Sequence, residues 1–514
     1  MKRFTLSFIV LVVAIGIPLL FIHSSEKDVT NDERVTLVEL NNALAFAIRT
    51  AENNYYKPVD KHAMYEGAIK GALAAIGDPY TFLLSERDHQ RSVENLYNAE
   101  FGGLGVSIYT DHRGFVKISK PMPGTPAETA QLQAGDYITK VNGKQIYLGE
   151  RTGMTIHDVV DLLRGAVDTD VTLTVQRKFL QPFEIKLTRA KISVPSVTST
   201  MLEDKIGYIR ITKFIGTDRA GGTEEEFNKA LAAHKDAEMQ ALILDLRSNQ
   251  GGLLDAAYHI ADAFINSGVI VSTRGRNSEF NEAYPAHSNI LCPPEIPIVV
   301  LVDEYSASAS EIVAGAIKDT GRGILVGTKT YGKGVVQKRY PLTGIGAISL
   351  TISSYYTPNG TSIDKSGITP QVPVAEVEPN RIEQVMQRLV SERNAVENFV
   401  TNWIEEEIKR TGEIPKDFAL LETGLPQFKQ TLASEGLRVS LRWLTLRAEQ
   451  LFNLNVGIER VVNLKYDTQL QEAIRIIKAD EVGSTIQLYH TLDQTLKFLG
   501  EELQNLAHGH GQIN

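Results

Sequence analysis

Three serines, Ser306, Ser308 and Ser310, lie where a strand-like run at residues 296–304 gives way to a helix-like segment at 309–320. A serine at such a junction projects from the first turn of a helix, where free backbone N–H groups and the positive helix end stabilise a developing oxyanion. The junction therefore suits a nucleophile. A second interpretation stays open, because Ser308 and Glu311 also form S-x-x-E, a capping box that needs no catalysis.

A nucleophilic serine needs a partner that takes its proton. The 11 histidines of the chain include none in a motif-like setting with an acid, and the sequence has no G-x-S-x-G elbow of the α/β-hydrolases. Lys333 is the remaining candidate base, since it lies between two glycines and before two valines, where burial would lower the pKa of its ammonium group. In an extended chain Gln337, four residues on, faces the same side and would orient Lys333 by a hydrogen bond.

Two other motifs compete for these residue types. Gly327 and the Gly332–Lys333 pair match G-x-x-x-x-G-K, the opening of a phosphate-binding loop, but Gly334 stands where a serine or threonine should bind magnesium. Ser362 and Lys365 match S-x-x-K, a dyad spacing that needs a helix. The prolines and glycines around them argue against a helix. The sequence therefore favours neither an ATP site nor the S-x-x-K dyad.

Composition excludes several classes of function. The formal net charge of -9, without a basic cluster, argues against a nucleic-acid binder. A single cysteine, Cys292, rules out an intramolecular disulfide and a cysteine-rich zinc site, and we expect it to be a buried apolar residue. The His-Gly-His-Gly run near the C-terminus is typical of a disordered end. We expect no metal and no other cofactor.

The first 25 residues have the pattern of an export signal. Lys2 and Arg3 precede an apolar run at 4–22, which nearly matches the roughly 17–25 residues that span a bilayer. No clean cleavage site follows, so residues 1–25 are either a cleaved signal peptide or a retained membrane anchor. Either alternative predicts an extracytoplasmic protein, in the bacterial periplasm or on the outer face of the inner membrane.

The spacing of apolar residues divides the rest of the chain into four regions. Residues 26–98 repeat apolar residues at helical intervals, whereas 99–190 alternate like paired strands with glycine turns. In 191–375 apolar strands alternate with helices, which predicts an α/β core with a largely parallel sheet. Residues 376–514 have a helical pattern, in which Trp403 and Trp443 are expected core residues.

Six segments occur in one order that is typical of a known family. They are EFGGLGVSI, PGTPAETAQLQAGDYITKVNG, IGYIRITKF, LILDLRSNQGGLL, SASASEIVAGAIKD and GTKTYGKGVVQ. Together they resemble the C-terminal processing peptidases, or tail-specific proteases, which are PDZ-containing serine proteases with a Ser–Lys dyad. The resemblance extends over roughly residues 35–375. It implies a PDZ domain, a β-rich α+β fold, at 99–190 and a protease core at 191–375.

The resemblance also assigns roles to residues of this chain. The nucleophile falls on Ser308, the general base on Lys333, the orienting amide on Gln337, and the oxyanion donors on the backbone N–H groups of Ala309 and Gly251. One departure is Gln250, where the family usually has proline; this change could loosen the turn but leaves the glycine N–H groups in place. The implied reaction passes through an acyl-enzyme.

The PDZ resemblance implies that the C-terminal carboxylate of a substrate binds backbone N–H groups at Gly103, Leu104, Gly105 and Val106 while the peptide adds a strand. In the family an arginine at the position of Arg164 is linked to coupling between PDZ domain and protease, although Arg164 also reads as a surface residue near a helix end. The expected partners are proteins or peptides with accessible C-termini, and the C-terminal helices would bind an adaptor or oligomerise. The alternative is a non-catalytic PDZ scaffold, which should have lost the dyad residues.

Overall fold

The computed structural model describes residues 36–97, 100–111, 113–148, 154–177, 180–216, 222–375, 379–458 and 462–479. The expected export segment at 1–25 and the histidines near the C-terminus lie outside these ranges. Within these ranges, none of the helices combines the length and the apolar content that a membrane span requires. The chain divides into two compact units, Met1–Ala72 and Leu73–Asn514. In the first unit α1 (Leu37–Asn54) starts at a capping box made by Thr36 and Glu39, and α2 (Lys61–Ala74) follows.

A six-stranded sheet forms the centre of the second unit. Its strands lie in the order β10 (Val197–Met201), β11 (Ile206–Ile211), β12 (Ala241–Asp245), β15 (Ile298–Val302), β16 (Ile324–Gly327) and β19 (Val372–Pro373). Strands β11 to β19 pair in parallel, and β10 pairs with β11 antiparallel. Every residue of β12 and β15 is buried, which explains why both strands read as continuous apolar runs.

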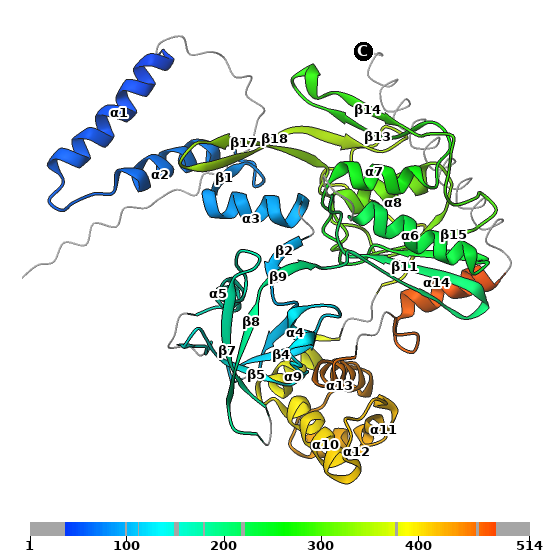
Figure 1. The fold of residues 1–514 in the computed structure, drawn as a ribbon. Coiled ribbons are helices and arrows are strands. Elements are labelled where there is room, and N and C mark those ends of the chain that lie inside the picture. Colours follow the sequence, from blue (N-terminus) through cyan, green and yellow to red (C-terminus); the bar gives the residue numbers. More distant parts are fainter. Residues whose placement is uncertain are drawn as a thin grey trace, which may run out of the picture. The chain divides into compact units, whose positions relative to one another are not determined.

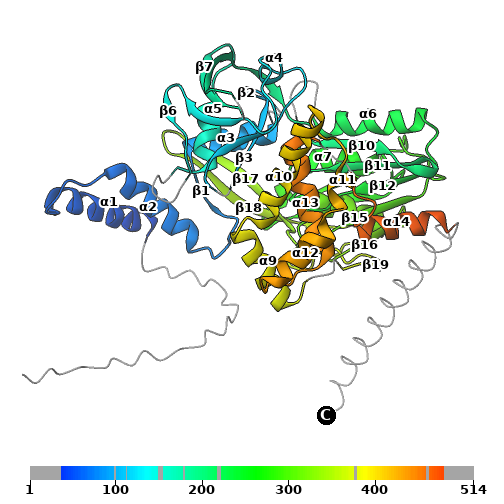
Figure 2. The same cartoon turned by 90° about the horizontal axis from the view of Figure 1, so that it is seen from below.

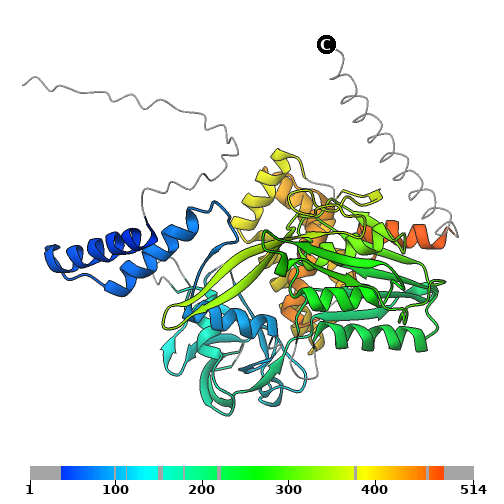
Figure 3. The ribbon, with the colours of Figure 1, turned by 90° about the horizontal axis from the view of Figure 1, so that it is seen from above.

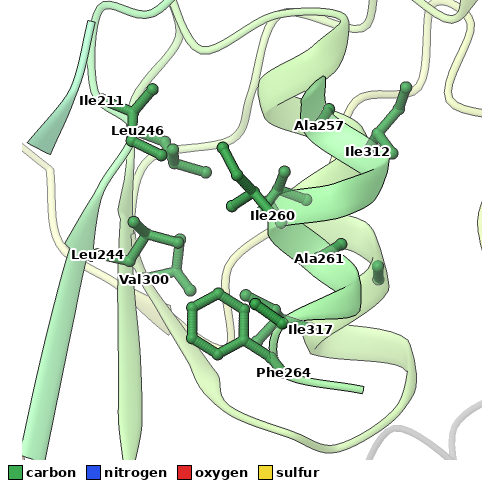
Figure 4. Packing of buried hydrophobic residues seen from close by; sticks show 14 of the residues in the cluster. Ile211, Leu244, Leu246, Ala257, Ile260, Ala261, Phe264, Val300, Ile312 and Ile317 are labelled. Atoms are coloured by element: carbon green, nitrogen blue, oxygen red, sulfur yellow. The ribbon is translucent and has the colours of Figure 1, made fainter. Parts of the chain in front are cut away.

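Helices cover both faces of this sheet (Figures 1 and 3). On one face lie α6 (Thr223–Asp236), α7 (Leu254–Asp262) and α8 (Ala309–Asp319). Figure 4 shows Ile260 and Phe264 packed against Leu244 and Val300 of the strands, whereas Ala257 lies toward Ile312 of α8. The other face is covered by α14 (Thr468–Lys478), whose Leu470, Ala473 and Ile476 are buried against the sheet.

A second, antiparallel sheet belongs to the same part of the chain. It contains β1 (Phe82–Ser85), β13 (Val269–Arg274), β14 (Glu282–Pro285), β17 (Val335–Leu342) and β18 (Gly346–Tyr356), and 3-10 turns lie at Glu203–Lys205 and Ser278–Phe280. The core is therefore of mixed strand direction, and the expectation of a largely parallel sheet is not confirmed for it as a whole. The reason is local, because a short turn makes β17 and β18 a hairpin.

The region expected to be a PDZ domain has its own sheet and core. After α3 (Glu86–Tyr97), its strands are β3 (Val106–Thr110), β4 (Val116–Pro121), β5 (Tyr137–Val141), β6 (Lys144–Gln145), β7 (Asp170–Gln176) and β8 (Phe183–Thr188), all paired antiparallel. The helices are α4 (Pro126–Thr129) and α5 (Ile156–Leu163). The entering strand β2 (Glu100–Gly103) pairs with the leaving strand β9 (Ala190–Ser193), so the module starts and ends at one place.

The described C-terminal helices do not form a single body. Figure 2 shows five neighbouring helices, α9 (Arg381–Glu392), α10 (Ala395–Thr411), α11 (Phe418–Glu422), α12 (Leu425–Ser434) and α13 (Leu441–Val456). They share a hydrophobic core, against which the half-buried Trp403 and Trp443 pack. This helical bundle touches the module before it, since Lys117 on β4 donates a hydrogen bond to Asn455 at 3.1 Å. Helix α14 instead belongs to the central sheet.

Helix α14 is held to the sheet by an ion-pair network as well as by apolar packing. Asp245 at the end of β12 is fully buried and accepts hydrogen bonds from Arg247 and from the Tyr208 hydroxyl at 2.6 Å. Arg247 also reaches Asp467, the N-cap residue of α14, through two hydrogen bonds of 2.7 Å. The bidentate geometry fixes α14 beside the loop that follows β12.

Replacing Asp467 should weaken this attachment. Asp467→Ala should lower the free energy of unfolding by about 2–4 kcal/mol, because it removes hydrogen bonds to a charged, largely buried Arg247 and uncaps α14. Asp467→Asn keeps a capping side chain and should lose only the ion-pair part. Denaturant unfolding followed by circular dichroism measures both. The control is Glu472→Ala, which removes the more exposed ion pair with Arg475 on the same helix and should change the free energy of unfolding by less than about 1 kcal/mol. An equal loss of stability in Asp467→Ala and Glu472→Ala would contradict the prediction.

Candidate active site

The predicted site residues come together at the carboxyl edge of the parallel strands. Strands β12, β15 and β16 are neighbours in the sheet, and each is followed by one loop of the site. The loop after β12 carries Gly251, the loop after β15 carries Ser308, and the loop after β16 carries Lys333. Ligands bind at this edge in many α/β proteins, because loops from several strands converge there.

The three serines differ in how their hydroxyl groups are engaged. Ser306 donates to the Leu246 carbonyl at 2.9 Å, and Ser310 donates to the Asn249 carbonyl at 2.8 Å. Both are fully buried and structural. The Ser308 hydroxyl donates to no residue in the described part of the chain, and Ser308, at 7% exposure, lines a cavity of about 1190 Å³. Ser308 is therefore the serine that is free to react.

The backbone of Ser308 adopts an unusual conformation. As the N-cap of α8 it has φ 56° and ψ -113°, a region that residues other than glycine rarely adopt. Such strain persists only where the surroundings determine the conformation, and it gathers at functional sites. The Ser308 N–H donates to the Glu311 carboxylate at 2.8 Å, and the expected capping box is present.

Glu311 does more than cap the helix. Its carboxylate is fully buried and accepts four hydrogen bonds: from the N–H groups of Ser308, Gly332 and Lys333 at 2.7–2.9 Å, and from the Thr330 hydroxyl at 2.6 Å. Burial raises the pKa of this carboxyl group, and the four donors oppose the rise. Glu311 thus joins the start of the serine helix to the segment that carries the lysine.

Sequence reasoning missed this second role of Glu311. The one indication in the sequence was the apolar residues around Glu311, which predict that its carboxylate is buried. A buried carboxylate is not solvated and needs hydrogen-bond donors from elsewhere in the protein. Nothing in the local spacing identifies the loop at 330–333 as the source of those donors.

Lys333 is half-buried on the wall of the same cavity as Ser308. Desolvation lowers the pKa of its ammonium group, against an opposing effect of the Glu311 charge. Among the residues that the structure describes, its Nζ forms no hydrogen bond and no ion pair, and it lies 4.9 Å from the centre of the Tyr80 ring. Desolvation, the larger effect, favours the neutral amine, the form that accepts a proton.

Gln337 lines the cavity but does not make the predicted bond to Lys333. Its side-chain amide donates to the Val335 carbonyl at 3.2 Å and lies 3.5 Å from the Thr351 hydroxyl. The prediction assumed one extended strand from Lys333 to Gln337, whereas β17 begins only at Val335, so Lys333 lies before the strand. The alternation of sides within a strand therefore does not place the two side chains on the same side. The pairing register also shifts at Gln337, because the pairing with β17 skips Ile352 of β18.

The two predicted oxyanion donors, Ala309 and Gly251, lie beside Ser308, but only the N–H of Gly251 is already hydrogen-bonded to a described residue. Gly251 has φ 98°, and a Cβ there would lie 2.8 Å from Ser308 Cβ and 3.0 Å from the Ala309 nitrogen. Its N–H, however, donates to the Asn249 side chain at 2.9 Å, so it is already engaged. The N–H groups of Ala309 and Gly252 donate to no described residue.

Asn249 holds the glycine turn in place, a role that sequence reasoning also missed. It is fully buried, its side chain donates to the Ile211 carbonyl at 3.0 Å, and its own carbonyl accepts from the Ala307 N–H at 3.0 Å and from Ser310. These bonds attach the turn on both sides of Ser308. Gln250, which stands in place of the family's proline, lines the cavity next to them.

The residues expected to bind a carboxylate lie between β2 and β3. Gly103 ends β2, Leu104 and Gly105 form the connection, and Val106 begins β3. The Leu104 and Gly105 carbonyls accept bonds from within the module, whereas their N–H groups donate to no described residue. Arg164 ends α5, and its guanidinium group lies 3.8 Å from the centre of the Phe101 ring on β2. It therefore contacts the strand that leads into this loop.

The remaining candidates have structural roles. Cys292 is buried as expected, and desolvation raises the pKa of its thiol. Ser362 and Lys365 lie in bridge and turn structure without a helix, so the S-x-x-K geometry is absent there. Across the described ranges no group of three or more His, Cys, Asp and Glu side chains is arranged to hold a metal ion.

Three family models match the chain. Peptidase family S41 matches residues 205–374, a PDZ domain matches 117–177, and the N-terminal domain of activating protease CtpB matches 22–87. A carboxy-terminal-processing protease of Bartonella bacilliformis is 38% identical over 360 residues, which cover 68% of this chain and 79% of that protein. A probable CtpA-like serine protease of Staphylococcus aureus is 33% identical over 355 residues, covering 69% and 68%. The solved photosystem II D1 C-terminal processing protease is 29% identical, covers 68% of this chain and 97% of its own, and gives a TM-score of 0.39.

The four bonds of Glu311 generate a stability prediction. Glu311→Gln keeps the shape but turns an NH₂ group toward two of the four donors, so the free energy of unfolding should fall by about 2–6 kcal/mol. Chemical denaturation measures the change. The control is Glu304→Gln at the same junction, where an exposed carboxylate accepts one bond from Thr328, and the change should stay below about 1 kcal/mol. A Glu311→Gln protein as stable as this control would contradict the role given to the carboxylate.

Proposed function

The chain belongs to peptidase family S41, the C-terminal processing serine proteases, and from this membership and the site geometry we propose that it is an exported endopeptidase with a Ser308–Lys333 dyad. The observation that carries the proposal is the contrast among the three serines. Of the three hydroxyl groups, only that of Ser308 has no acceptor among the described residues, and it shares its cavity with the half-buried Lys333.

The proposed reaction proceeds in two halves. Ser308 Oγ attacks the carbonyl carbon of the scissile bond while neutral Lys333 takes its proton, and the resulting ammonium delivers that proton to the leaving amine. The acyl-enzyme then reacts with a water molecule that Lys333 deprotonates, and the proton returns to Ser308 as the new carboxyl group leaves. No cofactor takes part in these steps.

The proposed oxyanion site uses the Ala309 N–H as its first donor. The first N–H groups of a helix have no partner within the helix, and their position beside Ser308 suits a negatively charged oxygen. The second donor comes from the Gly251–Gly252 turn. Gly251 would have to release its bond to Asn249 before it could serve, whereas the Gly252 N–H has no such bond among the described residues. Gln337 would likewise exchange its bonds to Val335 and Thr351 in order to orient Lys333.

Substrate selection is assigned to the PDZ domain, proposed to extend over residues 99–190 with the protease core at 191–375. A substrate C-terminus would place its carboxylate on the N–H groups of the loop from Gly103 to Val106, and its backbone would add a strand to the module. The N–H groups of Leu104 and Gly105, which donate to none of the residues that the structure describes, support this assignment. Export by residues 1–25 would place the reaction outside the cytoplasm.

Removal of either dyad member should abolish peptide-bond cleavage. Ser308→Ala and Lys333→Ala should each lower kcat by at least about 10³-fold, because the nucleophile and its base act as one unit. Lys329→Ala, in the same loop but exposed, is the matched control and should keep full activity. The measurement is cleavage of an unfolded protein with a free C-terminus, followed by mass spectrometry. Full turnover by Ser308→Ala or Lys333→Ala would exclude the dyad, and a non-catalytic scaffold predicts that even the unaltered chain cleaves nothing.

Activity should also depend on pH in a direction fixed by Lys333. Burial disfavours its ammonium form, so the folded pKa lies below the ordinary lysine value of about 10.4. Because the neutral amine is the active form, kcat/KM should rise with pH through this lowered pKa and then level off. Steady-state rates across neutral and alkaline pH test the sign, and a flat profile over that range would argue against a lysine base.

A further inference from the structure

One aromatic residue outside the proposed dyad faces the catalytic amine. The Tyr80 ring centre lies 4.9 Å from Lys333 Nζ, and Tyr80 also lines the cavity that contains Ser308. Tyr80 comes from the segment before β1, far from both dyad residues in the sequence. An aromatic face attracts a cation through its quadrupole, and the attraction is stronger where water is excluded.

The position of Tyr80 is fixed by a β-turn at residues 78–81. Asp78 and Pro79 are the residue types favoured at the first two positions of a type I turn, and the Thr81 N–H donates to the Asp78 carbonyl at 3.2 Å. The Asp78 carboxylate accepts from the Tyr80 N–H at 3.1 Å and from the Thr81 hydroxyl at 2.5 Å. The turn therefore holds the backbone of Tyr80 from both sides.

This turn is attached to the antiparallel sheet at the edge of the cavity. Thr81 is buried, and its hydroxyl accepts a hydrogen bond from the Thr351 N–H of β18 at 3.1 Å. The next four residues, β1, pair with β18, beginning with Phe82 opposite Ser349. Thr351 is also a neighbour of the Gln337 amide. The turn, β18 and the proposed orienting amide thus form one connected wall.

We propose that Tyr80 is a positioning residue for the Lys333 base, whose ring holds the amine at the wall of the cavity and stabilises its ammonium form. This inference rests on the proposed function, since it needs Lys333 to act as the base. Burial and the adjoining Tyr331 raise the pKa of Tyr80 to about 12, so the phenol stays neutral and acts through its ring face. Desolvation lowers the pKa of Lys333 but does not restrict the motion of its side chain. The Tyr80 ring opposes the fall in pKa and also holds Nζ in one direction.

Other charged and titratable groups surround the amine and must be counted. Glu311 acts on the charge of Lys333 from the helix side. The same cavity is lined by His89 on α3, Lys213 after β11, Asp255 on α7, Lys338 and Arg339 on β17, and the phenols of Tyr284 and Tyr355; Asp78, Tyr331 and Asp364 adjoin Tyr80. Among the described residues, Tyr80 is the one whose ring face lies against Lys333 Nζ. A substitution that removes this ring therefore distinguishes the effect of Tyr80 from the effects of the other groups.

The test compares Tyr80→Leu with Tyr80→Phe in the full chain, using the pH dependence of cleavage of an unfolded protein. Tyr80→Leu removes the ring, so the acid limb of kcat/KM should move to lower pH by about 0.5–1.5 units, the range that a desolvated cation–π contact implies. Its plateau kcat should fall about tenfold with little change in KM, because Lys333 loses its guide. Tyr80→Phe keeps the ring, so its limb should stay within about 0.2 unit of the unaltered chain.

A second series guards against misfolding of the leucine variant. Replacing Tyr80 by phenylalanine and then by ring-fluorinated phenylalanines keeps the shape and weakens the negative face stepwise, so the limb should move stepwise to lower pH. An unchanged limb in both Tyr80→Leu and the fluorinated series, or a Tyr80→Phe protein that behaves like Tyr80→Leu, would overturn the assignment. If Lys333→Ala retains activity in the same assay, both this inference and the dyad are overturned. If Lys333→Ala is inactive but the Tyr80 variants keep the pH profile and kcat of the unaltered chain, only the role of Tyr80 is overturned.

Discussion

The structure of the site depends on one buried carboxylate, that of Glu311. A charged group without water is costly in a protein interior unless donors surround it, and here four donors do so. Three of them are backbone N–H groups, from Ser308, Gly332 and Lys333. Because main-chain groups cannot move away independently of the fold, the carboxylate fixes the loop after β16 against the start of α8. The relative position of nucleophile and base is thereby determined by the backbone.

The central sheet makes this contact possible, because it places the loops after β12, β15 and β16 next to one another. Parallel pairing of β12, β15 and β16 brings their carboxyl ends to one edge, and apolar helices on both faces exclude water from it. Arg247 extends the same principle, since it links Asp245 at the end of β12 to Asp467 at the start of α14. The glycine turn follows Arg247 in the chain and is attached to the serine loop through Asn249. A series of hydrogen-bonded polar groups therefore connects α14 to Ser308.

The sequence predicted most of the elements, and the family resemblance is confirmed by the relatives, but long-range effects escaped it. Strong local periodicity located β12, β15 and α8, and motif order located Ser308 and Lys333 on one cavity. The bond between Gln337 and Lys333 is not formed in this structure, because Lys333 lies before the start of β17, and the orienting role of Gln337 stays a prediction. The role of Gly251 as an oxyanion donor stays a prediction, since in this structure its N–H donates to the Asn249 side chain. The second role of Glu311 and the place of Tyr80 were missed because their partners come from segments distant in sequence.

A lysine base poses an electrostatic problem, because it must lose its proton near neutral pH although a carboxylate close by would favour the ammonium form. The geometry resolves the conflict by separating the two functions of Lys333. Glu311 binds the Lys333 main-chain N–H, not its Nζ, and three further donors share the negative charge. The amine extends instead into the cavity toward an uncharged ring. The carboxylate can therefore hold the lysine rigidly in place while its effect on the proton affinity of the amine stays smaller than that of desolvation.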